Sequence, residues 1–451
     1  MDRRHFTAPL ALALTLFAGA PDASAQVTDQ TRAYCENRGE QFSRDLQIGS
    51  CTALIQSGQL DPSLLPYAFN SRGVAYIRQG DVRRALADFE QVIQLNPGFP
   101  GIFSNRGAAY ETLGDYPRAI ADYGQAIQLD PRNDKAYALR GIVFFKQSDY
   151  VRAIADLNQA LLINPQNFDA LNTRGAAYSD QGDYARAIAD FDRAIQLYPG
   201  FANAYHNRGL AYERQGNHAR AIQDLDQAIR LNPEFAQAYF QRGIAYENQG
   251  DHARAIQDFS EAMRLNPQDP EAPYQRGTIY LNQGDNARAI ADYTRSIQVG
   301  PRGYNAFRLR GQAYLSQGDY DRALVDANEA VRLAPQDAWV FNSRCWTRAV
   351  MGQGLPQALA DCNEALRLKP NDGNILNSRG FVNFRLGQLG AAFSDYDAAV
   401  RVDPASMDSL YMRGLVRSRL GQTAQGAADI AAATARDPGV AARYAGYGVT
   451  P

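Results

Sequence analysis

The sequence predicts an all-α protein in which tandem helical hairpins stack into a solenoid. The main observation is an arginine that returns every 34 residues and, after one inserted residue, twice more. Its positions are Arg72, Arg106, Arg140, Arg174, Arg208, Arg242, Arg276, Arg310, Arg344, Arg379 and Arg413. Proline and aspartate keep the same period, from Pro97 to Pro438 and from Asp88 to Asp429. Periods of this length are typical of solenoids, whose stacked repeats form extended binding surfaces.

Residues 1–25 are predicted to be a secretory signal peptide. Arg3 and Arg4 precede an apolar run at 8–20, and Ala-Ser-Ala at 23–25 supplies the small residues of a cleavage site. The apolar run is too short to span a bilayer, so stable membrane insertion is not expected. The arginine pair also resembles a twin-arginine signal, but the residues that flank it favour the general secretory route. We therefore expect an exported protein, periplasmic or secreted.

Each repeat is predicted to contain two helices joined by a glycine turn. In the fifth copy, residues 204–212 form the first helix and residues 219–231 the second, with the turn at Gly216. Residues at spacings of three and four share one face of a helix. Small residues on the facing sides, Gly209 and Ala221 among them, predict a tightly packed antiparallel pair.

The spacing within the unit resembles the tetratricopeptide repeat. The first helix carries a large residue–x3–Gly–x2–Tyr, and the second carries Ala–x3–aromatic–x2–Ala–x4–Pro. The resemblance extends over residues 66–438 as eleven tandem repeats, and glycine follows the periodic arginine in ten of the eleven copies. It implies a right-handed superhelix. It also implies a concave groove that is lined by the first helix of each repeat and receives extended peptides or helices.

Two fixed slots have predicted structural roles. An aspartate directly after the turn should cap the second helix, because its carboxylate accepts hydrogen bonds from free backbone amides. It occurs at Asp81, Asp115, Asp149, Asp183, Asp251, Asp285 and Asp319, and Asn217 replaces it in the fifth copy. The periodic arginine and aspartate are expected to form a ladder of ion pairs, since a partly buried arginine needs a carboxylate. The alternative is a charged rail that holds a ligand.

Four cysteines are predicted to form two disulfides, Cys35–Cys51 and Cys345–Cys362. Cys345 replaces the glycine of the ninth copy, and Cys362 takes the aromatic slot of the second helix, so the two face each other across one hairpin. Cys35 and Cys51 have a similar separation, 16 residues against 17. In an oxidising compartment, such pairs form disulfides.

Both ends of the array are expected to be capped. Residues 26–65 contain the first cysteine pair and are predicted to form a degenerate helical hairpin that covers the N-terminal end. Residues 439–451 are too short for a full repeat. We expect them to form a short C-terminal cap that contains a stub of helix.

Composition and motifs exclude several functions. With 46 basic and 48 acidic residues the net charge is −2, so nucleic-acid binding is not expected. The cysteines lack the histidine partners or CxxC spacing of a zinc site, and no phosphate-binding loop indicates a cofactor. Of the four histidines, only His206 is expected to be free for chemistry. Because the repeats leave no room for a catalytic domain, the protein is predicted not to be an enzyme.

The predicted function is that of an exported, non-enzymatic scaffold or adaptor. It is expected to bind a protein or peptide partner in the concave groove of the superhelix. One alternative is an envelope scaffold that binds a glycan or exopolysaccharide-export machinery, because groove aromatics stack on sugars as well as on peptide side chains. A further alternative is the regulatory arm of an enzyme complex.

The binding groove is predicted to centre on repeats six to eleven. Inward-facing positions carry small residues such as Ala138 and Ala176 in the early copies and aromatic residues in the later ones. Exposed aromatics with few charges are what interface centres favour. The predicted partner-binding residues are His206, Phe240, Tyr274, Arg308, Trp339, Trp346, Phe381, Phe384 and Tyr411. The alternative is that some of them pack against the next repeat, Trp346 in particular.

Overall fold

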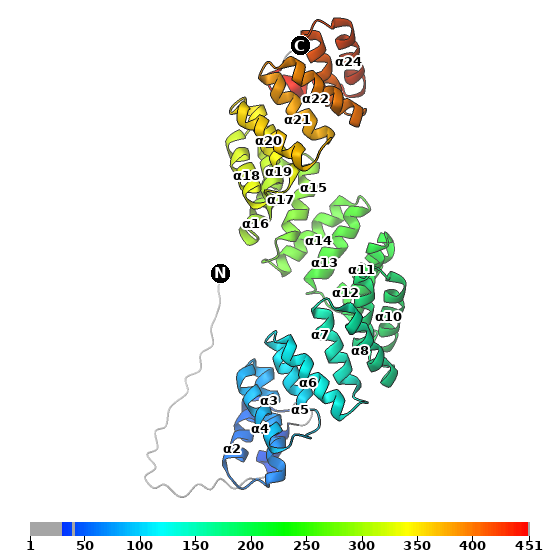
Figure 1. Cartoon of the computed structure of the whole chain (residues 1–451). Coiled ribbons are helices and arrows are strands. Elements are labelled where there is room, and N and C mark those ends of the chain that lie inside the picture. The colour runs from blue at the N-terminus through cyan, green and yellow to red at the C-terminus, as the bar shows by residue number, and fades with distance from the viewer. Residues whose placement is uncertain (1–28, 38–40, 450–451) are drawn as a thin grey trace, which may run out of the picture. The chain divides into compact units, whose positions relative to one another are not determined.

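The structure, a computed structural model, describes residues 29–37 and 41–449. The predicted signal peptide of residues 1–25 lies outside the described residues and stays a prediction. The described residues form 25 α-helices and one 3-10 helix and contain no β-strand (Figure 1). The all-α prediction is therefore confirmed. No helix among the described residues combines the length and the apolar character needed to cross a membrane.

The chain divides into two compact units, residues 1–199 and residues 200–451. Unit 1 contains α1 (Asp29–Glu36), α2 (Arg44–Gln56), the 3-10 helix (Pro62–Leu64), α3 (Leu65–Gln79), α4 (Val82–Leu95), α5 (Ile102–Thr112), α6 (Tyr116–Leu129), α7 (Asp134–Lys146), α8 (Tyr150–Ile163), α9 (Phe168–Asp180) and α10 (Tyr184–Leu197). Unit 2 contains α11 (Ala202–Arg214), α12 (His218–Leu231), α13 (Ala236–Asn248), α14 (His252–Leu265), α15 (Glu271–Asn282), α16 (Asn286–Val299), α17 (Tyr304–Ser316), α18 (Tyr320–Leu333), α19 (Ala338–Met351), α20 (Leu355–Leu368), α21 (Gly373–Arg385), α22 (Leu389–Val402), α23 (Met407–Arg419), α24 (Thr423–Arg436) and α25 (Val440–Gly446). Helices α3 to α24 alternate as first and second members of antiparallel hairpins, and within each unit every second helix contacts the first helix of the next hairpin.

Most hairpins close by bringing a second-helix side chain onto a first-helix glycine. At Gly243 in α13, a Cβ atom would lie 2.8 Å from Cε1 of Phe259 in α14, so no side chain fits there. Phe259 is fully buried by this approach. The turn between the two helices passes through Gly250, whose φ of +80° is a left-handed conformation that glycine adopts without strain. The glycine slots therefore set both the distance between the helices and the turn that joins them.

The aspartates that follow the turns cap the second helices, as predicted. Oδ1 of Asp251 accepts a hydrogen bond of 3.0 Å from the backbone N–H of Arg254, and Nε of Arg254 donates to the other carboxylate oxygen at 2.6 Å. Equivalent caps occur at Asp81, Asp115, Asp149, Asp183, Asp285 and Asp319. Asn217 caps α12 through its side-chain oxygen.

The periodic arginines and aspartates form the predicted ladder of ion pairs. Nε and Nη2 of Arg276 donate to the two carboxylate oxygens of Asp292 at 2.8 and 2.6 Å, which joins the two helices of one hairpin. Nη1 of Arg276 donates to Oγ of Ser260 in the preceding hairpin at 2.6 Å. All eleven periodic arginines pair with their aspartates. Because Asp292 is only 5% exposed, the pair belongs to the structure and is not a rail open to a ligand.

Both predicted disulfides are present. Cys35 in α1 is bonded to Cys51 in α2, and Cys345 in α19 is bonded to Cys362 in α20. All four cysteines are buried, and each bond joins the two helices of one pair. Helix α2 in turn packs against α3, the first helix of the array.

Candidate functional site

The candidate site lies on the first helices of unit 2. Neighbouring first helices contact each other in the pairs α15/α17, α17/α19, α19/α21 and α21/α23. Among the described residues, neighbouring second helices make no contacts of this extent. The first helices therefore lie closer together than the second helices and form the inner side of the stack. We use the name first-helix face for the side chains that the first helices α11 to α23 of unit 2 present on that side.

Five of the predicted residues are accessible on the first-helix face. Phe240 in α13, Tyr274 in α15, Arg308 in α17, and Trp339 and Trp346 in α19 are half-buried. The rings of Phe240 and Tyr274 rest on aromatic rings of their second helices, at centroid distances of 5.7 and 5.9 Å. Consecutive hairpins therefore supply a row of large side chains whose outer parts remain free to contact another molecule.

Tyr274 lines a pocket of about 530 Å³ between α15 and the start of α17. Pro270, Tyr304 and Asn305 form other parts of its wall. Burial raises the pKa of Tyr274, and the charge of Arg308 opposes that shift. The hydroxyl of Tyr274 therefore stays protonated at neutral pH, so the pocket combines apolar surface with a hydrogen-bond donor.

A second pocket, of about 350 Å³, is lined by Arg308, Trp339 and Trp346. Nε of Arg308 donates to Oδ1 of Asn305 at 3.3 Å, and Arg308 forms no ion pair within the described part of the chain. Nζ of Lys369 lies 4.8 Å from the ring centroid of Trp339. The pocket thus joins two indole rings to a guanidinium whose charge no neighbouring carboxylate neutralises.

Buried polar atoms without hydrogen-bond partners recur at one equivalent position of several first helices in the described chain. Oγ of Ser104, Nε2 of His206, Oδ1 of Asn342 and Oδ1 of Asn377 are buried, and none has a partner among the residues that the structure describes. All four residues stand two places before a periodic arginine. Asn342 also lines the second pocket, although its Oδ1 atom is itself buried.

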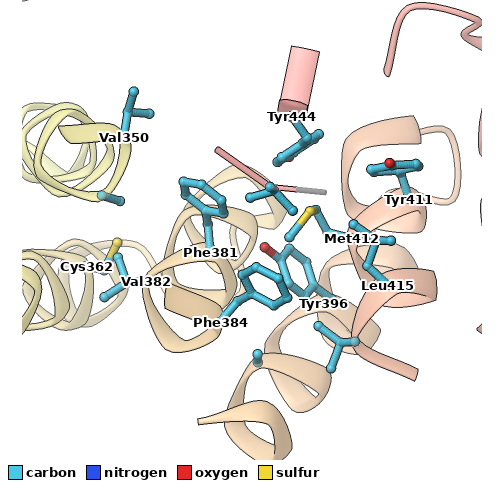
Figure 2. Packing of buried hydrophobic residues seen from close by; sticks show 14 of the residues in the cluster. Val350, Cys362, Phe381, Val382, Phe384, Tyr396, Tyr411, Met412, Leu415 and Tyr444 are labelled. Carbon is cyan, nitrogen blue, oxygen red and sulfur yellow. The ribbon is translucent and has the colours of Figure 1, made fainter. Parts of the chain in front are cut away.

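Three predicted binding residues are buried, so the expectation that they are exposed is wrong. Phe381, Phe384 and Tyr411 are 0, 6 and 1% exposed. Phe381 in α21 and Tyr411 in α23 do lie on the first-helix face, but the C-terminal segment of the chain covers them. Phe384 packs beside Tyr396 in the same core (Figure 2). The guanidinium of Arg419 lies 4.5 Å from the ring centroid of Phe384.

His206 is not the free histidine that the sequence predicts. The side chain is buried, its ring centroid lies 4.9 Å from that of Phe235, and Nδ1 lies 3.2 Å from Oδ1 of Asn207. Burial lowers the pKa of His206, while the hydrogen bond to Asn207 opposes that shift. His206 is therefore a neutral packing residue at pH 7. Within the described residues, no group of histidine, cysteine and carboxylate side chains is arranged to hold a metal ion.

The C-terminal helix α25 lies over the first helices of the last two hairpins, and Tyr447, which follows it, reaches the first helix of the hairpin before them. Tyr444 stacks on Tyr411 at a centroid distance of 5.7 Å and makes an edge contact with Phe381 at 5.9 Å (Figure 2). Tyr447, directly after the helix, contacts Trp346 at 5.6 Å and forms part of the wall of the second pocket. Trp346 also lies 5.1 Å from the ring centroid of Phe381 in the next hairpin, so it packs against the next repeat, as the alternative in the sequence analysis has it, and against the chain's own C-terminus as well.

Tyr304, Asn342 and Tyr447 line the two pockets, although the sequence did not predict them as parts of the site. Tyr447 had a signal, since Val440, Tyr444 and Tyr447 follow a helical spacing of four and three that places them on one face. The sequence signal for Asn342 was weaker, because it consists only of a polar residue at a first-helix position that the structure places on the first-helix face. Tyr304 gave none, because residue types at the start of the first helices vary from copy to copy.

Comparisons with known proteins identify relatives of the fold. No curated protein matches the sequence. Among solved structures, a tetratricopeptide repeat protein from Parabacteroides merdae is 21% identical, with a TM-score of 0.45 over 55% of this chain and 98% of its own. The MamA protein is 28% identical, with a TM-score of 0.34 over 38% of this chain and 92% of its own. PilF of Pseudomonas aeruginosa is 20% identical, with a TM-score of 0.43 over 47% of this chain and 97% of its own.

Family models match most of the repeat array. Models described as tetratricopeptide repeat match residues 72–143, 206–270 and 274–338. A model described as TPR repeat matches residues 143–182 and 177–216. Because these matches together span more than half of the chain and coincide with its helical hairpins, the protein belongs to the tetratricopeptide repeat family.

Proposed function

We propose that the protein is an exported scaffold that binds a peptide segment of a protein partner on the first-helix face between α13 and α19. The tetratricopeptide repeat is generally a non-enzymatic scaffold for protein interactions, which gives the class of function. The observation that carries the proposal is the row of accessible aromatic residues, Phe240, Tyr274, Trp339 and Trp346, beside two pockets. Aromatic side chains set in pockets are typical anchors of protein interfaces.

The two pockets indicate the chemistry of the partner segment. The pocket at Tyr274 suits an apolar side chain, and the tyrosine hydroxyl can donate to a main-chain carbonyl. In the second pocket, Arg308 offers hydrogen-bond donors and a positive charge beside the rings of Trp339 and Trp346. A peptide with apolar anchors and a carboxylate that reaches Arg308 fits this arrangement.

The proposed location is outside the cytoplasm. The signal-like composition of residues 1–25 supports export. The two buried disulfides support it independently, because such bonds persist in oxidising compartments and are rare in the cytosol.

The test is affinity capture from an envelope extract, followed by binding measurements with the recovered partner. Tyr274→Ala and Trp339→Ala should each weaken binding by about 1–3 kcal/mol and leave the helical circular-dichroism signal unchanged. Val325→Ala is the matched control, because Val325 is an exposed apolar residue on the second helix α18.

Normal binding by both face variants, together with weaker binding by Ser104→Ala, would move the site to unit 1 and contradict the proposal. Capture of a polysaccharide in place of a protein, lost in the same two face variants, would favour the glycan-binding alternative.

A further inference from the structure

Residues 440–449 cover the first-helix face at the last three hairpins. We propose that this segment is a built-in ligand: it occupies a site for a short amphipathic helix, and a partner helix of the same chemistry displaces it. The inference rests on the proposed function, since both place the partner on the first-helix face. It adds the kind of segment that binds, where it binds, and what it must remove.

Apolar anchors hold the segment in place. Val440, Tyr444 and Val449 are 0, 1 and 2% exposed. Figure 2 shows Tyr444 pointing from its short helix into the space between Phe381 and Tyr411. Grooves that receive a helix read anchors at spacings of three and four, which is the spacing of Val440, Tyr444 and Tyr447, and Val449 follows beyond the end of the helix. The occupant is therefore recognised as a helical peptide.

Polar contacts fix the register of the segment. Nη1 of Arg385 in α21 donates to the backbone carbonyl of Tyr447 at 3.0 Å. Nε and Nη2 of Arg443 both donate to Oδ1 of Asp408 in α23 at 3.1 Å, and Nη2 also donates to Oδ2 of Asp437, directly before the segment, at 2.6 Å. These contacts add two requirements to the partner helix: a basic residue one position before its central aromatic anchor, and a free carbonyl just after its last turn.

The segment is not part of any hairpin, but its anchors share one core cluster with Phe381 and Tyr411, so a helix that displaces it must cover the same apolar surface. Helix α25 has seven residues, and an isolated helix of that length is not stable in water. It follows α24 through residues 437–439, and no further hairpin packs over it in the described chain. The second pocket meets the segment at Tyr447, so a partner bound at Trp339 is already adjacent to the site that α25 occupies.

The experiment uses the full chain and a fluorescently labelled synthetic peptide of residues 437–449 as the probe. The double variant Tyr444→Ala/Tyr447→Ala removes two anchors of the cis segment. Fluorescence anisotropy should give a Kd about tenfold lower for this variant than for the wild type, because a tethered segment competes at an effective concentration in the millimolar range. A peptide that carries Tyr444→Ala should not bind either protein.

A charge exchange tests the register. Adding Asp408→Arg to the double variant should weaken its binding of the peptide. A peptide that carries Arg443→Asp should bind this triple variant with the original affinity. Equal peptide affinity for the wild type and the double variant, or binding to neither, would overturn the proposal.

If the double variant loses its helical signal, hydrogen–deuterium exchange of the wild type tests instead whether the segment opens independently of the hairpins beneath it. The proposal requires that amides of α25 exchange faster than those of α23, and equal protection of the two would overturn it. The peptide-binding and exchange experiments do not depend on capture of the partner. If Tyr274→Ala and Trp339→Ala weaken the partner but the peptide never binds, the proposed function stands and only the built-in ligand is rejected.

Discussion

Two arginines of unit 2 show how burial separates structural from binding residues. Arg276 is on the 34-residue period and places its guanidinium on the buried carboxylate of Asp292. Arg308 is off that period, stands at a position whose residue type changes between copies, and forms no ion pair among the described residues. The guanidinium of Arg276 offsets the free-energy cost of burying the Asp292 carboxylate. Arg308 leaves its charge available to another molecule.

Arg276→Ala should lower the free energy of unfolding by about 3 kcal/mol, because it leaves the Asp292 carboxylate buried without its partner. Arg288→Ala is the matched control: it removes an arginine from the next helix whose pair with Asp285 is exposed, and such pairs contribute little. Urea denaturation followed by circular dichroism measures both. Equal losses in the two variants would show that the ladder does not stabilise the hairpins.

At the scale of one hairpin, the same two slots are closed in two chemically different ways. In α13/α14, Gly243 admits the ring of Phe259. In α19/α20, Cys345 and Cys362 take the equivalent places and are joined covalently, with their Cα atoms 5.5 Å apart. The disulfide replaces a packing contact at the hairpin that also carries both tryptophans of the face.

Removing the Cys345–Cys362 bond should destabilise this hairpin. Cys345→Ala/Cys362→Ala is expected to lower the free energy of unfolding by about 3 kcal/mol, the value typical of a loop of this length. Cys345→Gly/Cys362→Phe should lower the free energy of unfolding by less, because it introduces the same glycine–phenylalanine contact that Gly243 and Phe259 make in α13/α14. Denaturant unfolding of the oxidised proteins measures the three, and a stability equal to wild type in the alanine variant would contradict the prediction.

At the scale of the whole molecule, small contributions repeat along the array. A hydrogen bond from the backbone N–H of Arg288, and a second from its side chain, hold the pKa of Asp285 below its ordinary value of 3.8. Hydrogen bonds of the same kind lower the pKa of Asp81, Asp115, Asp149, Asp183, Asp251 and Asp319. A carboxylate with a lowered folded pKa stabilises the protein above its unfolded pKa, and that stabilisation is lost as the pH falls through the folded pKa.

Replacing the seven capping aspartates by asparagine should therefore flatten the acid side of the stability profile. Asparagine keeps a capping oxygen, as Asn217 does in the fifth hairpin, but it does not titrate. Between about pH 5 and about pH 2.5, the melting temperature of the wild type should fall more steeply than that of the sevenfold variant. Thermal unfolding at constant ionic strength tests this, and parallel profiles would exclude the caps as a source of acid sensitivity.

The sequence by itself determined every feature that lies within one repeat. The hairpins, the glycine contacts, the aspartate caps, the Arg–Asp pairs and both disulfides follow from residues at most 17 positions apart. Apart from the two disulfides, these contacts recur with the period, so many copies of the same signal indicate each one. Local physical chemistry is sufficient there, because the partners are brought together by a single turn.

Only the tertiary structure decided which predicted groove residues are accessible. Tyr411 stands in the same slot as Phe240 and Tyr274, and Phe381 in the same slot as Trp346, yet Phe381 and Tyr411 are buried, with Tyr444 packed on both. The contact of Tyr444 with these rings occurs once and joins α25 to helices from earlier hairpins. The repeat period therefore does not predict it. The apolar spacing within the segment reveals that it must cover something, but the choice of surface depends on the positions of three stacked hairpins, which a one-dimensional pattern does not contain.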